Sequence, residues 1–208
     1  MDEISLVQRF QAGEETAFEQ LYELYKNPAL RSAFLITGNY ADSENVLQET
    51  FLSCYQNLPK LKDPGSFKPW FYRILTRNAW RYCKKRDKET PVAAVFVEQQ
   101  TLAEPLEPSV LELLAAAETQ AALLAAIDCL PLKQKTVIIL YYYDELSVQE
   151  IAQATGLLVG TVKSRLYTAR QNLKKSLLEL AGEQGIKQFA QQNNFREVGK
   201  NDLRIQAR

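Results

Sequence analysis

Histidine is absent from the 208-residue chain, and cysteine is scarce. The lack of histidine excludes a Ser-His-Asp triad, a Cys–His dyad, a His-Glu-x-x-His zinc site and a Cys2His2 zinc finger. Cys54, Cys83 and Cys129 form no C-x-x-C pair, so we expect reduced packing residues and no metal site. No G-x-x-x-x-G-K-[ST] loop is present, which excludes a P-loop ATPase. We therefore expect no catalytic residue and no cofactor.

Long apolar runs are also missing. No stretch of about 18 apolar residues exists, so we expect no insertion into a membrane. The first ten residues, MDEISLVQRF, lack the apolar core of a signal peptide, so we expect a cytoplasmic protein. Hydrophobic residues nevertheless make up 46% of the chain, which is enough for one or two domains with cores.

Apolar residues recur at helical spacing through most of the chain, which predicts an all-α protein. The best strand pattern, TVIILYYY at 136–143, fits a buried helix equally well. The N-terminal pattern has breaks at Gly13 and Pro28, and the last strongly periodic helix is expected to end at Gly182 and Gly185. The other expected helices run from after Asp42 to Leu58, from Phe67 to Lys88, and from Ser109 to about Leu130.

Charge is distributed unevenly, although 25 basic residues balance 25 acidic ones. Residues 68–89 hold eight basic and two acidic residues, and residues 151–178 hold five basic residues and no acidic one. Between these zones, residues 91–132 hold six acidic residues and no basic one. Two basic zones on separate parts of the chain indicate a two-part surface that binds a polyanion. The proline-containing, weakly periodic residues 89–108 are interpreted as a flexible acidic linker.

The second basic zone has the pattern of a helix-turn-helix. Ser147 and Glu150 form a capping box, Thr155-Gly156 supplies a tight turn, and a longer helix starts near Val159. Within this second helix, Val162, Leu166, Ala169 and Leu173 share one stripe, whereas Gly160, Lys163, Ser164, Tyr167 and Gln171 face away. Such a helix can enter the major groove of DNA. The alternative is a three-helix bundle with a solvated basic face.

The first basic zone combines cations with aromatic rings. Six residues fall within about 60° of one direction on the helix from Phe67: Trp70, Arg73, Arg77, Trp80, Lys84 and Lys88. Phe71, Leu75, Asn78 and Tyr82 lie opposite and are expected to form the buried face. Unpaired bases stack on aromatic rings while cations follow the phosphates, so this face could bind single-stranded DNA. The alternative is that one or both tryptophans are core residues.

Four sequence strings resemble bacterial RNA polymerase sigma factors of the extracytoplasmic-function group. They are LSVQEIA at 146–152, VGTVKSRL at 159–166, DSENVLQETF at 42–51 and WFYRI at 70–74. The resemblance covers about 6–88 and 115–180. Leu158, Thr168, Asn45 and Arg77 depart from the family's common pattern.

The resemblance implies two helical domains, 1–88 like sigma region 2 and 109–181 like region 4, followed by a tail over 182–208. It implies no catalysis by the chain. Its implied partners are promoter DNA, the β′ and β subunits of core RNA polymerase, and an anti-sigma factor, which can be membrane-bound. The rival interpretations are a dimeric helix-turn-helix regulator and a polymerase-associated adaptor that does not read DNA.

The expected site residues fall into three groups. Those for the −35 element are Thr161, Lys163, Ser164, Arg165, Tyr167, Thr168 and Arg170, with Arg165 and Arg170 mainly on phosphates. Those for the −10 element and melting are Trp70, Arg73, Arg77, Trp80, Arg81 and Lys84. Those implied to contact core polymerase are Asp42, Glu44, Asn45, Gln48, Glu49 and Phe51.

Overall fold

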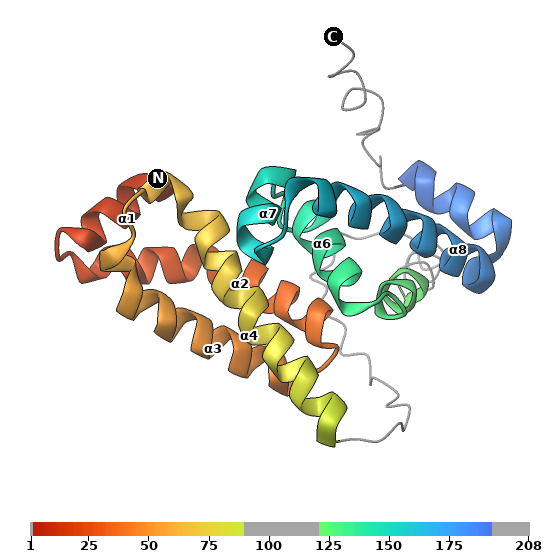
Figure 1. Ribbon diagram of the computed structural model, residues 1–208, viewed down its shortest axis with the longest axis horizontal. Helices are drawn as coiled ribbons and strands as arrows, with labels where there is room; N and C mark the ends of the chain where they lie inside the picture. The colour runs from red at the N-terminus through yellow and green to blue at the C-terminus, as the bar shows by residue number, and fades with distance from the viewer. Residues whose placement is uncertain (1, 90–120, 193–208) are drawn as a thin grey trace, which may run out of the picture.

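The computed structural model describes residues 2–89 and 121–192, with side chains described for 2–86 and 121–177. Regular structure in these ranges is helical, without a strand, which confirms the predicted fold class. The helices are α1 (Glu3–Gln11), α2 (Glu15–Thr37), α3 (Tyr40–Asn57), α4 (Phe67–Glu89), a segment over 121–128, α6 (Leu132–Tyr142), α7 (Val148–Thr155) and α8 (Val159–Gln192) (Figure 1). The predicted linker, 89–108, falls almost wholly outside the described residues.

Two predicted helix ends are wrong. Pro28 does not break α2, because the buried residues Tyr25 and Ala29 on either side of it pack into the core. Tertiary packing can hold a helix that local propensity opposes. The last helix does not end at Gly182 but runs to Gln192, since glycine weakens a helix interior by only about 1 kcal/mol.

The start of α3 also differs slightly from its predicted place. The helix begins at Tyr40 because Asn39 caps it, with the Asn39 side chain accepting a hydrogen bond from the Asp42 amide at 2.9 Å.

The ambiguous apolar run at 136–143 lies mostly in α6. Residues 135–140 are all buried, so α6 is covered on every side through this stretch. A helix that is covered all round shows no amphipathic period, which explains why the pattern could not separate helix from strand.

The N-terminal half has an aromatic core at the crossing of α2, α3 and α4. Phe71 of α4 is fully buried, and its ring centroid lies 4.9 Å from that of Tyr25 and 5.3 Å from that of Phe51. Tilted aromatic pairs at such distances add stability beyond the area that they bury. This core fixes the rotation of α4 about its axis and therefore the direction of its cations.

The C-terminal half is the predicted helix-turn-helix. The Ser147 side chain accepts from the Glu150 amide at 3.2 Å, and the Ser147 amide donates to Glu150 at 2.7 Å, which completes the capping box of α7. Gly156 ends α7 with φ of 69°, a left-handed conformation that glycine adopts without strain. Val162, Leu166 and Ala169 are buried and hold α8 against its neighbours.

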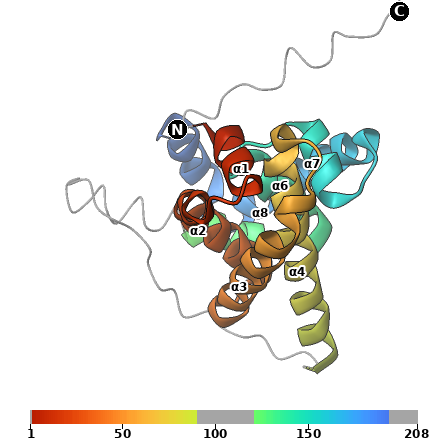
Figure 2. The same ribbon diagram turned by 90° about the vertical axis from the view of Figure 1, so that its left-hand side faces the viewer.

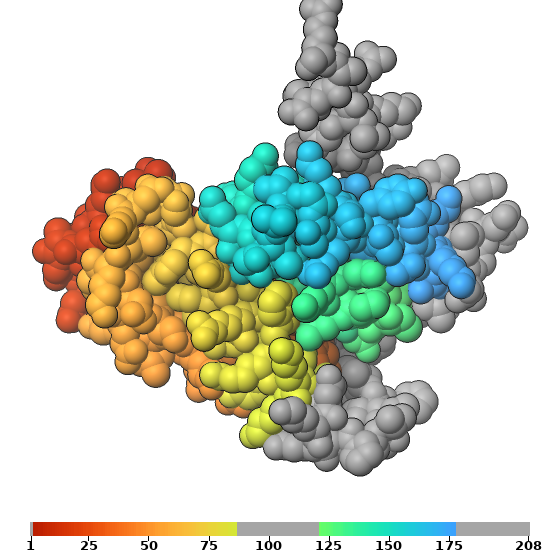
Figure 3. Space-filling view, in the orientation of Figure 1, coloured from red at the N-terminus to blue at the C-terminus, as the bar shows by residue number. Residues whose placement is uncertain are grey.

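The two halves pack directly against each other. Both views show α4 between the N-terminal helices and α7 (Figures 1 and 2), and α6 also contacts α2. In the space-filling view the yellow atoms of α4 adjoin the teal and green atoms of the C-terminal half (Figure 3). Buried residues from both halves form one continuous hydrophobic cluster.

Candidate nucleic-acid interface

The first turns of α8 present the side chains that are expected to read duplex DNA. Lys163, Ser164, Tyr167 and Thr168 are exposed, and Tyr167 is 66% exposed. They lie opposite the buried stripe of α8, so the predicted division of this helix into a buried and an outer face is confirmed. Exposed hydroxyl and ammonium groups on a rigid helix can donate hydrogen bonds to base edges and phosphates.

Three other predicted −35 residues, Thr161, Arg165 and Arg170, are half-buried. The Arg170 guanidinium lies over the rings of Tyr141 and Tyr142, 5.4 and 5.6 Å from their centroids. Its Nε also donates to the Tyr142 hydroxyl at 2.9 Å. Arg170 thus ties α8 to α6 in this structure. Its expected contact with a phosphate stays a prediction.

The outer face of α4 is cationic, as its residue pattern predicts. Arg73, Arg77, Arg81 and Lys84 are exposed along successive turns, whereas the side chain of Lys88 lies outside the described set. An open cavity of about 620 Å³ follows this face, and its described lining is Arg77, Asn78, Trp80, Arg81, Lys84 and Lys85. A cation-lined hollow with an indole on its wall can hold phosphates and an unstacked base.

The two tryptophans of α4 are both half-buried. The Trp70 ring packs 6.0 Å from that of Phe67. Trp80 packs against the core, and its indole N–H donates to the Thr136 hydroxyl of α6 at 2.9 Å. The Trp80 ring is expected to face the unwound strand, but in this structure its N–H is hydrogen-bonded to the C-terminal half.

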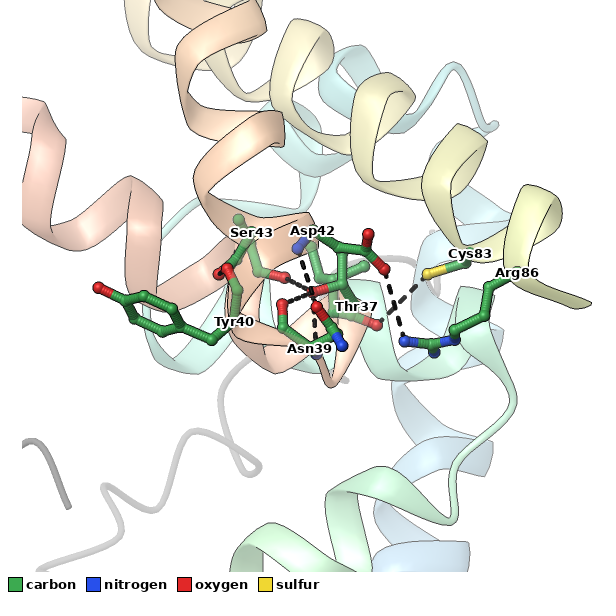
Figure 4. Close-up of polar contacts among 9 residues, drawn as sticks. Thr37, Asn39, Tyr40, Asp42, Ser43, Cys83 and Arg86 are labelled. Atoms are coloured by element: carbon green, nitrogen blue, oxygen red, sulfur yellow. Dashed lines mark hydrogen bonds and ion pairs between the residues drawn. The ribbon is translucent and has the colours of Figure 1, made fainter. Parts of the chain in front are cut away.

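The polar face of α3 lies beside the cations of α4. Glu44, Asn45 and Gln48 are exposed. Asp42 approaches Arg86 at 3.6 Å near the turn between α2 and α3 (Figure 4).

Glu49 links the same two helices at a second point. Its carboxylate pairs with Arg81 and accepts from the Tyr82 hydroxyl at 3.0 Å. Two predicted polymerase contacts, Asp42 and Glu49, thus neutralise cations of the helix that is expected to bind DNA.

Phe51 corrects the predicted polymerase-contact set. It is 7% exposed and packs between the rings of Tyr22 and Phe71, at centroid distances of 4.7 and 5.3 Å, so it holds the core rather than a partner. Exposed apolar residues on the later turns of α3 are instead Leu52 and Tyr55, at 59% and 43% exposure, and Tyr40 at its first position is 42% exposed. Sequence reasoning missed them, although Leu52 lies one helical turn beyond Gln48 and therefore on the same face.

Asp144 is a buried acidic residue that the sequence pattern does not single out. It is 6% exposed, and its carboxylate accepts hydrogen bonds from Ser32 of α2 and Tyr72 of α4. Burial raises the pKa of Asp144 to about 6, while hydrogen bonds from Tyr72 and Ser32 and the charge of Lys68 act to lower it. Nothing in the local sequence around Asp144 indicates these partners, which lie more than 70 residues away.

The cysteines divide into two kinds. Cys54 and Cys83 are buried, and burial raises the pKa of the Cys54 thiol to about 12, which fits an unreactive packing residue. Cys129 is exposed, so its predicted packing role is wrong. Within the described ranges, no group of histidine, cysteine and acidic side chains could hold a metal ion. None of the helices in those ranges combines the length and apolarity needed to cross a bilayer.

Two family models match the chain over the helices just described. The model of sigma-70 region 2 matches residues 21–89, and that of sigma-70 region 4 matches residues 120–173. The first match contains α4 with its cationic face, and the second contains the helix-turn-helix. The two basic zones therefore belong to two different regions of the same protein family.

Individual proteins show the same relationship. The ECF RNA polymerase sigma factor SigW of Bacillus subtilis (strain 168) is 28% identical over 181 residues, which cover 84% of this chain and 96% of SigW. CnrH, solved in complex with the cytosolic domain of CnrY, shares the fold with a TM-score of 0.63 at 22% identity, over 84% of this chain and 96% of CnrH. The sigma factor RpoE of Bartonella quintana, solved with the anti-sigma factor NepR, gives a TM-score of 0.61 at 20% identity, over 79% and 98%. The chain belongs to the extracytoplasmic-function group of RNA polymerase sigma factors.

Proposed function

We propose that the chain brings core RNA polymerase to promoters by reading the −35 element with α8 and the unwound −10 strand with α4. The observation that carries this proposal is a pair of exposed faces, one in each matched sigma-70 region: the cationic side of α4 and the polar side of α8 that carries Lys163. Lys163, Ser164 and Tyr167 are suited to base edges in a groove. Arg73, Arg77 and Lys84 are suited to the backbone of a single strand, and Trp80 to a base.

The chain is proposed to act as a cytoplasmic, non-catalytic subunit. Extruding a base from a duplex costs a few kcal/mol, which stacking and polymerase contacts can offset without nucleotide hydrolysis by this chain. We propose that the chain is divided into a region 2-like domain over 1–88, a linker over 89–108, a region 4-like domain over 109–181 and a tail over 182–208. The α8 helix crosses the last of these boundaries without interruption, so the tail begins as a helical extension of the second domain.

The polymerase contact is proposed to lie on α3. Glu44, Asn45 and Gln48 form an exposed polar row, and Leu52 and Tyr55 extend it with apolar surface. Mixed polar and apolar surface of this kind is typical of protein interfaces. Asp42 and Glu49 would join the contact after exchanging their arginine partners for groups of the polymerase.

An anti-sigma factor is the proposed regulatory partner. The Bartonella quintana relative was solved with one, and this chain shares its fold. Co-purification from cells grown without and with a stress would test the point. Recovery of polymerase alone under every condition would place control elsewhere, for example in the level of synthesis.

Transcription in vitro tests the proposed function. Core polymerase is mixed with the full chain and a library of promoter fragments, and the starts of the transcripts are sequenced. We expect starts that depend on both components and that share two upstream elements. Tight binding of the chain alone to a palindrome, without any effect on polymerase, would instead indicate a dimeric regulator, which matches to two sigma-70 regions do not favour.

A further inference from the structure

The two halves of the chain are joined by hydrogen bonds from one stripe of α4. Tyr72, Thr76 and Trp80 are spaced four residues apart and therefore lie along one side of the helix. The Tyr72 hydroxyl donates to Asp144 at 2.6 Å, and the Trp80 indole donates to Thr136 at 2.9 Å. Between them, the Thr76 hydroxyl donates to the Tyr72 carbonyl at 2.8 Å and lies 3.2 Å from the carbonyl of Ala154. The contacted residues Asp144, Ala154 and Thr136 all belong to the C-terminal half.

Asp144 is the most constrained member of this contact. The Ser32 hydroxyl lies 2.7 and 2.9 Å from its two carboxylate oxygens, so α2 and α4 both bind the same buried group. A buried carboxylate is costly unless donors satisfy it, and here both donors come from the other half of the chain. Separating the halves returns Asp144 to water but also exposes the apolar surface around it, so the contact favours the closed arrangement.

This arrangement cannot engage both promoter elements. The −35 and −10 elements are named for their positions on the DNA and therefore lie about 25 base pairs apart. This spacing is roughly 85 Å at about 3.4 Å per base pair. In the structure α4 packs on α7, and the reading residues of α8 start about ten residues after Ala154, so they lie no more than about 35 Å from it. The two halves must therefore separate before the chain can engage both elements.

We propose that the Asp144–Ser32–Tyr72 contact is a latch that holds the unbound chain closed, with the C-terminal half covering the Trp80 edge of the strand-binding face. This inference rests on the proposed function only for the role of the α4 face in binding a DNA strand. The closed state itself does not depend on that function. Release of the latch is then a step that precedes promoter binding. Thr76 and Trp80 extend the same contact along α4 and widen the area that must separate.

The latch is tested by the distance between the halves in the full chain. Spin labels are attached to the exposed native Cys129 and to an exposed site on α3 made by Gln56→Cys. Tyr72→Phe and Ser32→Ala each remove one donor to Asp144, and we expect each to raise the ratio of open to closed molecules about tenfold. Binding of fluorescent single-stranded DNA of mixed sequence should strengthen in parallel.

Each variant has a matched control within the N-terminal half. Tyr25→Phe removes a buried hydroxyl that donates to Glu3, and Ser43→Ala removes one that donates to the carbonyl of Tyr40. We expect both controls to leave the distance distribution unchanged. Unchanged distances in Tyr72→Phe and in Ser32→Ala would overturn the latch. Longer distances without stronger DNA binding would keep the latch and refute the proposed role of the α4 face.

Discussion

Lys163, Ser164 and Tyr167 are placed by the residues behind them. Val162, Leu166 and Ala169 are buried at 0–3% exposure, so the first turns of α8 cannot rotate without breaking the core. Side chains on such a fixed helix meet DNA in a defined register. We therefore expect base selectivity to depend on single residues of this face.

Lys163→Ala should relax the preference for one base position of the −35 element. A good side-chain pairing with a base contributes about 1–3 kcal/mol of discrimination. Selection of promoters from a randomised −35 pool by the holoenzyme measures this change. Lys174→Ala, an exposed lysine further along α8, is the control and should affect all sequences alike. An unchanged preference in Lys163→Ala would remove this lysine from the base contacts.

Arg170→Ala should instead destabilise the C-terminal half by about 1–2 kcal/mol. The substitution removes the cation from the rings of Tyr141 and Tyr142 and the hydrogen bond to the Tyr142 hydroxyl. Thermal unfolding followed by circular dichroism measures the loss, and Lys174→Ala serves again as the control. If stability is unchanged while DNA binding weakens for every sequence, Arg170 is a phosphate contact after all.

At the scale of helices, α3 and α4 share their charges. Glu49 pairs with Arg81 and Asp42 approaches Arg86, all at partly exposed positions. Exposed ion pairs of this kind contribute little to stability, about 0–1 kcal/mol. These side chains can consequently exchange their partners for polymerase or DNA at small cost.

Phe51→Ala should destabilise the N-terminal half by about 3–5 kcal/mol, because it leaves a cavity among Phe18, Tyr22 and Phe71. Gln48→Ala, one turn earlier on the exposed side of α3, should leave stability unchanged and weaken binding to core polymerase. Unfolding in urea and a pull-down with core polymerase separate the two effects. A Phe51→Ala chain of normal stability that no longer binds polymerase would restore Phe51 as a contact.

Local patterns predict the helices of this chain well and its long-range contacts poorly. The capping box at Ser147, the turn at Gly156 and the cationic side of α4 follow from neighbouring residues, and they are present. The burial of Asp144 depends on Ser32 and Tyr72, which no spacing rule connects to it. Pro28 misled the prediction because the core on both sides of it outweighs its local effect.

At the scale of the whole molecule, α4 serves two surfaces. One side carries the exposed cations, and the stripe of Tyr72, Thr76 and Trp80 binds the C-terminal half. A change in the packing of the halves therefore changes what DNA can reach. Ionisation of Asp144 is expected to cause such a change in packing.

Raising the pH should favour the open chain. In the closed form burial raises the pKa of Asp144 to about 6, although the hydrogen bonds from Tyr72 and Ser32 and the charge of Lys68 act to lower it. In the open form, where Asp144 meets water, its pKa returns toward about 3.9. Between about pH 4 and about pH 6, Asp144 is protonated in the closed form but ionised in the open one. Protonation of Asp144 therefore stabilises the closed form most below about pH 4, and this stabilisation is lost as the pH rises through about 6.

The distance between labels on Cys129 and Gln56→Cys measures this change. We expect the fraction of molecules with the long distance to rise between about pH 5 and about pH 7.5. Asp144→Asn cannot ionise and should flatten the dependence. An open fraction that falls with rising pH would contradict the assignment to Asp144.

We expect the two halves to be packed together in the unbound chain and to be apart on the promoter. The most direct measurement is the distance between labels on Cys129 and Gln56→Cys in the wild-type background, first alone and then with core polymerase and promoter DNA. A single short distance for the chain alone, replaced by a long one in the promoter complex, is the predicted result. The same short distance in a transcribing complex would contradict the account.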